Sequence, residues 1–437
     1  MKLGKLSLVA VMALGTSVFA IDNVKVNGEA KLWYQTSEFS GPAAVAAGTD
    51  TQKFFNKTTN SSADVKLSVG ATADLLQNLS AGVKMTGLTT LGLENNLVGA
   101  TPAAKYDNAG TAGGTSALND QSWVEEAYLA YTVGKTTAKI GRQALNTPLA
   151  FTETWNVVEN TFEAAVLLNN DVPDTTLVGA WVGKHNGVGL LATAARGTTV
   201  AQNGAFSTFG VSGAYAAGAI NKSIPNTTAQ AWYYNVPDIA TAYWLQADTK
   251  IVDMVSLGAQ YAGMMPDSTS TTLGAADANH RDTNVIAVKA AVDVAGVNLY
   301  AAYSSVNKGT LGFANVATGD KSSVYTTLGS IYFDGEIAAA PDTKAWKTGA
   351  STKLVPGVAL AASYGQAKTG DNGGTAGPVV GASTANCDFS AWDVTANTKA
   401  GPVDLTAIYT QFKKDVQNTD TGDKTTDTFR VIASLKF

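Results

Sequence analysis

Apolar and polar residues alternate along the last ten positions of the chain, 428–437, with Ile432 as the one exception. Because side chains of a β-strand alternate between the two faces of a sheet, this pattern predicts a strand with one apolar face. A soluble sheet can share the pattern, but a chain that ends there on an aromatic residue is typical of an outer-membrane barrel. We expect Phe437 to lie at the end of the strand that closes the barrel and to act as the membrane-assembly signal.

Alternating segments of similar length recur along the whole chain, as a transmembrane barrel requires. Their number, eighteen, is even, so both ends of the chain would lie on one side of the membrane. We therefore predict an all-β, antiparallel transmembrane barrel of about 18 strands. The segments begin near Val24, Ala63, Leu79, Ser122, Thr136, Thr161, Thr176, Ala205, Thr227, Ala240, Met254, Thr283, Val297, Trp346, Val358, Phe389, Val403 and Asp427.

The connections between these segments alternate between short turns and long polar stretches, which predicts short periplasmic turns and long external loops. Two connections break the alternation: the turn at 217–226 is long and the loop at 236–238 is short, so the register between 217 and 240 stays undecided. The long stretches are 36–61, 91–121, 143–160, 185–204, 264–282, 306–345, 368–388 and 414–425.

Residues 1–20 have the features of a signal peptide: two lysines, an apolar stretch at 6–14, and small residues before position 21. The apolar stretch is shorter than the roughly 20 residues that a transmembrane helix needs. We expect residues 1–20 to be removed on export and residues 21–437 to form one barrel domain.

Composition agrees with an exported barrel. Charged residues make up 15% of the chain and the mean hydropathy is +0.02, as lipid-facing and lumen-facing residues in alternation produce. Without Lys2 and Lys5, 28 basic residues stand against 35 acidic ones, a net charge of about −7. No basic patch dominates, so nucleic acid is not an expected partner. The single cysteine, Cys387, cannot form an internal disulfide, and we assign it no role.

Several aromatic residues fall on the predicted outward face near strand ends, where amphipathic rings would sit at the level of the lipid headgroups. Packing between neighbouring strands is an equally good interpretation of each one. They are Tyr34, Trp123, Tyr131, Tyr261, Tyr303, Tyr409 and Phe437.

An enzymatic function finds no support in the sequence. The two histidines, His185 and His280, fall in predicted external loops, without the neighbours of a nucleophile–base pair. No glycine-rich phosphate loop follows a strand and opens a helix. We therefore expect no catalytic site.

The chain resembles the major outer-membrane porins of epsilon-class proteobacteria, distant relatives of the OprD-type specific porins. The resemblance lies in the opening MKLGKLSLVA, VNGEAKLWY of the first strand, WVEEAYLAYT, KIGRQALNTPLAFTETWNVVENTFEAAVL followed by TTLVGAWVG, and the final TFRVIASLKF. It implies an eighteen-stranded barrel in the bacterial outer membrane, a homotrimer in contact with outer-membrane lipids, and diffusion of small hydrophilic solutes.

The resemblance also implies a third external loop, here 143–160, that folds into the lumen and narrows it. Some members of the family hold calcium there with carboxylates, and only Glu153 corresponds to such a ligand. Apart from this open question of calcium, we expect no cofactor.

Ion selectivity can be predicted from charges. No Lys or Arg lies between Arg142 and Lys184, a stretch that contains Glu153, Glu159 and Glu163. We expect these three to line the pore constriction, Glu163 because it alternates with apolar neighbours. Carboxylates in a pore concentrate cations, so the sequence predicts a passive, mildly cation-selective channel. Lumen-facing lysines could offset this effect or form an opposing positive wall; they are Lys31, Lys66, Lys84, Lys139 and Lys289.

Two further points stay open. Glu125 shares the predicted outward face with Trp123 and Ala127, so it would lie near the outer rim or be covered by a neighbouring subunit, unless a local bulge turns it inward. The alternative function is a surface adhesin or antigen whose external loops bind partners.

Overall fold

The computed structural model describes residues 21–48, 53–55, 61–89, 120–187, 200–268, 270, 280–330, 337–371, 386–417 and 421–437. The predicted signal peptide, 1–20, lies outside these residues. In the part of the chain that is described, no helix is long and apolar enough to span a membrane.

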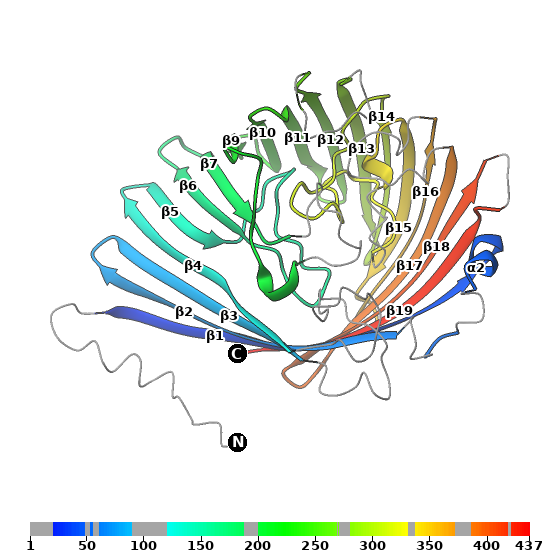
Figure 1. The fold of residues 1–437 in the computed structure, drawn as a ribbon, viewed down its shortest axis with the longest axis horizontal. Coiled ribbons are helices and arrows are strands. Elements are labelled where there is room, and N and C mark those ends of the chain that lie inside the picture. The colour runs from blue at the N-terminus through cyan, green and yellow to red at the C-terminus, as the bar shows by residue number, and fades with distance from the viewer. Residues whose placement is uncertain are drawn as a thin grey trace.

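Eighteen antiparallel strands form a closed ring, which confirms the predicted barrel (Figure 1). Consecutive ring strands pair with each other, and β19 pairs with β1 to close the ring. The ring strands are β1 (Asp22–Ser40), β2 (Ser61–Leu76), β3 (Leu79–Thr89), β4 (Gln121–Val133), β5 (Thr136–Gln143), β6 (Phe162–Asn169), β7 (Thr175–His185), β9 (Ala214–Asn221), β10 (Thr227–Val236), β11 (Ala240–Val252), β12 (Val255–Pro266), β13 (Thr283–Val294), β14 (Val297–Val306), β15 (Thr343–Thr352), β16 (Val358–Thr369), β17 (Cys387–Ala400), β18 (Val403–Val416) and β19 (Lys424–Lys436).

The last residue completes the closure. Glu29 lies opposite Lys436 in the β1–β19 ladder, and beyond this pair Gly28 donates to the Phe437 carbonyl (2.7 Å) while the Phe437 N–H donates to Gly28 (3.0 Å). A Cβ on Gly28 would lie 2.5 Å from the Phe437 ring, so the glycine leaves the space that the ring fills. The role of Phe437 as an assembly signal stays a prediction.

The segment predicted as one strand from Ala205 is divided. A short strand, β8 (Ser207–Thr208), pairs only with β7 and lies outside the ring, and the ring strand β9 begins at Ala214. Between them, Gly210 and Gly213 have φ values of +56° and +78°, which glycine adopts without strain. The chain leaves the ladder here, and the turn after β9 covers only 222–226. This is the region where the sequence pattern left the register open.

A β-bulge in β4 corrects two predictions. Lys84 pairs with Glu126 and the next residue, Met85, pairs with Val124, so Glu125 is the extra residue. The bulge turns the Glu125 side chain inward and buries it, whereas we predicted it to face outward. Trp123 is also buried inside the barrel rather than on its outer face. A single inserted residue reverses the face of every position beyond it.

Two long loops return into the barrel (Figure 1). Inner loop A, residues 144–161, packs Val157 and Val158 against inward aromatic residues of β1 and β4. Inner loop B, residues 307–330 and 337–342, packs Phe313 against Trp244 of β11, with ring centroids 6.5 Å apart. The core of this protein is therefore made by loops against the inner wall rather than by a second layer of sheet. The helices are short and include α2 (Pro42–Ala46) and η3 (Gln202–Gly204).

The outer wall is apolar but uneven. Strands β10–β18 carry outward aromatic rings, several of which pack against rings of neighbouring strands in tilted or edge-on pairs. In β2–β6, Tyr131 is the one outward aromatic residue among those described, and the other apolar residues there are aliphatic or small. The rings on β10–β18 are Tyr233, Tyr243, Tyr261, Tyr303, Trp346, Tyr364, Trp392 and Tyr409.

Candidate functional site: the charged inner wall and its two loops

Ion pairs cover the inner face of β1 and β2. The carboxylate of Glu29 pairs with Lys66 and lies 3.5 Å from the Nζ of Lys31. The hydroxyl of Ser434 also donates to Glu29 (2.6 Å). All these positions alternate with exposed apolar residues such as Leu32 and Leu67, so they face the lumen. The two lysines thus lie on the predicted side of the wall, with a carboxylate between them.

A second cluster continues this wall on β3–β5. The Nζ of Lys84 lies 2.7 Å from Glu125 and 3.8 Å from Glu159 of inner loop A, and Glu126 lies opposite Lys84 in the ladder. Lys139 also faces inward, with its Nζ 3.6 Å from the centroid of the Tyr128 ring. Glu159 retains 23% side-chain exposure, whereas Glu153, the other predicted constriction carboxylate inside the barrel, is 2% exposed.

Glu153 does not line open lumen; it joins the two inner loops. It is 2% exposed, and its carboxylate accepts hydrogen bonds from Asn315 (2.9 Å), the Lys321 N–H (3.2 Å) and the Thr318 hydroxyl, all in inner loop B. The Trp155 indole also donates to it. Burial raises the pKa of the Glu153 carboxyl, and the hydrogen bonds that it accepts oppose the rise. Its contacts are those of a latch between loops.

Glu163 faces the outside of the barrel, which corrects the prediction that it faces the lumen. Its neighbours Phe162 and Ala164 are buried against other inner residues. Side chains therefore alternate between the two faces as predicted, but here the apolar face is the inner one. Glu163 pairs with Arg142 (3.0 Å) and Lys184 (3.5 Å). The sequence signal failed because the inner wall is itself apolar where loops pack on it, so polarity alone does not identify the lumen side.

The opposite wall carries fewer charges, and they contact inner loop B. Lys289 lies on the inner face of β13, with its Nζ 2.7 Å from Asp248 and 4.1 Å from the Tyr325 ring centroid. The Tyr325 hydroxyl donates to Asp248 (2.9 Å), and burial together with this carboxylate raises the pKa of Tyr325. Nearby, Lys347 donates to the Thr327 carbonyl (2.8 Å). Here the charged groups anchor a loop.

Sequence reasoning placed Arg430 on the polar face of the last strand but gave it no role. It is 1% exposed, and its guanidinium lies 4.5 Å from the Trp33 ring centroid and 5.4 Å from that of Trp155. It donates to Gln35 and to the Trp155 carbonyl (2.8 Å). Arg430 therefore fixes inner loop A to the strand pair that closes the barrel. The signal available for this contact was an arginine on the inner face near a tryptophan, because an arginine can pack on an aromatic ring.

The described residues include no group of three or more Asp, Glu, His or Cys side chains arranged to hold a metal ion. The contacts of Glu153 are hydrogen-bond donors, which suit an anion rather than a cation. The geometry thus does not support calcium binding at Glu153.

The histidines do not form a catalytic arrangement with the residues described around them. His185 ends β7, buried against the Phe209 ring at 4.4 Å between centroids. The Nδ1 of His280 lies 3.1 Å from the Ser268 carbonyl. Cys387 is buried in β17. The charged inner wall can attract, repel and orient ions, which requires no chemical step.

Comparison with known proteins agrees with this arrangement. A family model described as Campylobacter major outer membrane protein matches residues 1–437. OccK8 (OprE) of Pseudomonas aeruginosa has a similar structure over 95% of this chain and 98% of its own, with a TM-score of 0.67 and 15% identity. The structure of OpdK with vanillate, from the same organism, matches over 94% and 99%, with a TM-score of 0.64 and 13% identity. No curated protein matches the chain.

Identities this low carry only the fold, but the family model covers the whole chain. The chain belongs to the Campylobacter major outer membrane protein family, and it forms an outer-membrane barrel of the porin type.

Proposed function

We propose that this barrel is a water-filled porin through which small hydrophilic solutes and ions diffuse, with a mild preference for cations. The proposal rests on the charged inner wall of β1–β5. Inner loop A narrows the lumen beside this wall and places Glu159 next to Lys84. An eighteen-stranded ring is wide enough to leave an aqueous path unless loops fill it. Inner loops A and B reduce that path and set the size limit.

Cation preference rests on fewer carboxylates than the sequence suggested. Glu153 is buried and Glu163 faces outward, so neither can concentrate ions in the lumen directly. Of the predicted carboxylates only Glu159 remains, and the structure adds Glu126; both lie beside Lys84, near Lys139. Because positive and negative groups alternate along this wall, we expect weak selectivity that decreases as salt screens the charges.

Reversal potentials in a KCl gradient test this selectivity. We expect the wild type to prefer K⁺, and Glu126→Gln with Glu159→Gln to move the reversal potential toward zero. Glu163→Gln is the matched control: it removes one carboxylate from the outer face and should leave the reversal potential unchanged. Anion preference in the wild type, or an equal shift in the control, would refute the assignment.

The porin would act as a homotrimer whose subunits meet through the outer face of β2–β7. Two observations favour this face. Its strands β2–β6 largely lack the outward aromatic rings found on β10–β18. It also presents the charged group of Arg142, Glu163 and Lys184, which acyl chains would solvate poorly and a neighbouring subunit could cover.

A further inference from the structure

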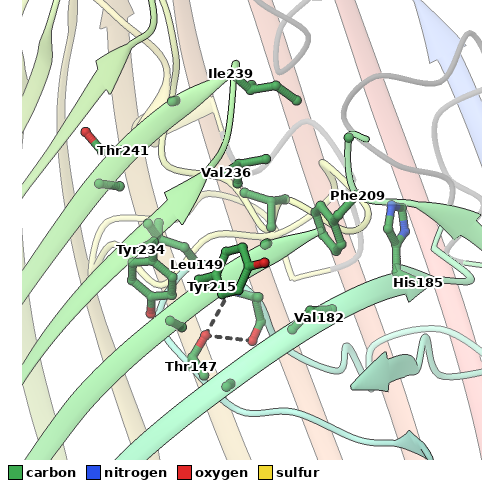
Figure 2. A pocket seen from close by; sticks show the side chains of 18 of the residues that line it. Thr147, Leu149, Val182, His185, Phe209, Tyr215, Tyr234, Val236, Ile239 and Thr241 are labelled. Atoms are coloured by element: carbon green, nitrogen blue, oxygen red, sulfur yellow. Dashed lines mark hydrogen bonds between the residues drawn. The ribbon is translucent and has the colours of Figure 1, made fainter. Parts of the chain in front are cut away.

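A partly open, mainly apolar chamber lies on the inner side of the barrel wall. It has a volume of about 310 Å³ and sits between the inner face of β7 and β9–β12, inner loop A and the segment 207–210. Figure 2 shows labelled side chains from inner loop A, β7, the segment 207–210 and β9–β11 arranged around one space. The apolar lining includes Leu149, Val182, Phe209, Ala216, Ala242 and Met264.

The chamber has one buried histidine at its edge. His185 lines it and is 6% exposed, and its Nδ1 has no hydrogen-bond partner among the residues described. Its ring packs against Phe209 (Figure 2). A neutral imidazole has one donor and one acceptor nitrogen, so either tautomer can pair with a hydroxyl group. A buried polar atom without a partner carries a free-energy cost that a hydroxylated ligand would remove.

Size and polarity define the occupant. The lining is mostly apolar, but Thr147, Tyr234 and Thr241 also contribute hydroxyl groups to it, so water is the competing occupant at this polar part of the chamber. If the chamber were empty, its lining atoms would lose dispersion contacts. An engineered apolar cavity of about 150 Å³ in another protein binds benzene, so there is room here for one substituted ring. We propose that the chamber binds a small single-ring phenol, its ring among the apolar side chains and its hydroxyl on Nδ1 of His185.

The chamber adjoins a groove on the outer face of the barrel. Thr208 and Gly210 line both the chamber and this groove, which runs along β5–β7 past Ile140 and Trp181. The segment that leaves the ladder between β8 and β9 is therefore the partition between the two spaces.

Fluorine NMR with 4-fluorophenol tests the site on full-length protein in detergent micelles. We expect a protein-dependent resonance, distinct from the micelle resonance, in the wild type. Ala216→Phe fills the chamber and should abolish the resonance. Ala217→Phe is the matched control, because it adds the same ring to the adjacent, exposed position of β9 and should leave the resonance intact. Ala242→Leu, on β11, is a second filling variant if Ala216→Phe does not fold, and heat-modifiable mobility on gels reports folding.

His185→Phe separates the hydrogen bond from simple apolar binding. The wild type should bind 4-fluorophenol about tenfold more tightly than fluorobenzene, the ratio expected for one neutral hydrogen bond. His185→Phe should reduce this ratio to about one. In crystals soaked with 4-bromophenol, the anomalous bromine signal should lie inside the chamber.

Three outcomes would overturn the proposal: equal resonances in wild type and Ala216→Phe, no preference for the phenol over fluorobenzene, or bromine only at other positions. Bromine in the chamber without a protein-dependent resonance in solution would mean binding at crystal concentration only, and would also overturn it. None of these results depends on ion conduction, so the chamber and the porin function are tested separately.

Discussion

The two halves of the barrel differ on both faces. Along β1–β5 the inner face is charged, with Lys31, Lys84 and Glu125 paired to carboxylates or lysines around them. Along β10–β14 the inner face is mainly apolar, with the Asp248–Lys289 pair as an exception, and it lies beneath inner loop B, where Trp244 and Phe313 are fully buried. The outer faces show the opposite trend: outward aromatic rings are numerous on β10–β18 and scarce on β2–β6.

This contrast indicates that the barrel is not a uniform tube. By our proposal, the half with the charged inner wall lines the solute path and meets the neighbouring subunits with its outer face. The other half supports a loop on its inner wall and anchors in lipid through aromatic rings on its outer wall. Both halves show the same alternation of residues along their strands. Alternation determines that the two faces of a strand differ, but it does not determine which face is polar.

The largest expected effect tests the outer faces. Ala127→Trp places a bulky ring on the outer face of β4 and should prevent trimer assembly, because a tight interface tolerates overpacking poorly. Ala301→Trp places the same ring on the exposed outer face of β14 and should leave the trimer intact, since aromatic residues already surround it. Gel mobility without heating measures the trimer. A normal amount of trimer in Ala127→Trp would show that the subunit interface is not formed by β2–β7.

The next effect tests the inner apolar wall. Phe313→Ala removes the ring that packs on Trp244, and such a truncation of a buried Phe costs about 3–5 kcal/mol. We expect inner loop B to detach and single-channel conductance to increase with larger fluctuations. Val211→Ala is the control, because Val211 is 98% exposed and its truncation should change nothing. A steady conductance of wild-type size in Phe313→Ala would show that polar contacts alone hold the loop.

The barrel could be predicted from the sequence because each of the eighteen strands has one face toward lipid. This requirement produces a periodic pattern of apolar residues along the chain. The prediction failed where one residue breaks the period: the extra Glu125 reversed Trp123, and the departure at 209–213 divided the strand predicted from Ala205. The candidate site was harder, because inner loops bury parts of the wall. Nothing in the sequence pattern shows that Glu153 contacts Asn315, which lies far along the chain.

A smaller effect tests the charged group on the outer face. Glu163→Gln leaves Arg142 and Lys184 without their carboxylate, and in a covered interface this costs about 1–3 kcal/mol. The temperature at which the trimer dissociates should therefore decrease. Asp404→Asn breaks the Lys399 pair (2.9 Å), in which both side chains are well exposed, so it should have almost no effect. Equal behaviour of the two variants would mean that the outer charged group faces solvent or lipid headgroups instead of protein.

The smallest effect concerns the place where the two halves meet. Glu153 of inner loop A accepts hydrogen bonds from Asn315 and Lys321 of inner loop B. Glu153→Gln replaces one of its acceptor oxygens with an NH2 group, which would face these donor groups. We expect more frequent conductance fluctuations, because the latch weakens, and an almost unchanged reversal potential, because a buried carboxylate beside Lys321 adds little to the field in the lumen. Glu159→Gln should do the reverse: a shifted reversal potential with steady conductance. Single-channel recordings of the two variants in the same KCl gradient separate the two roles. If Glu153→Gln shifts the reversal potential as much as Glu159→Gln does, Glu153 acts on ions in the lumen and our assignment is wrong.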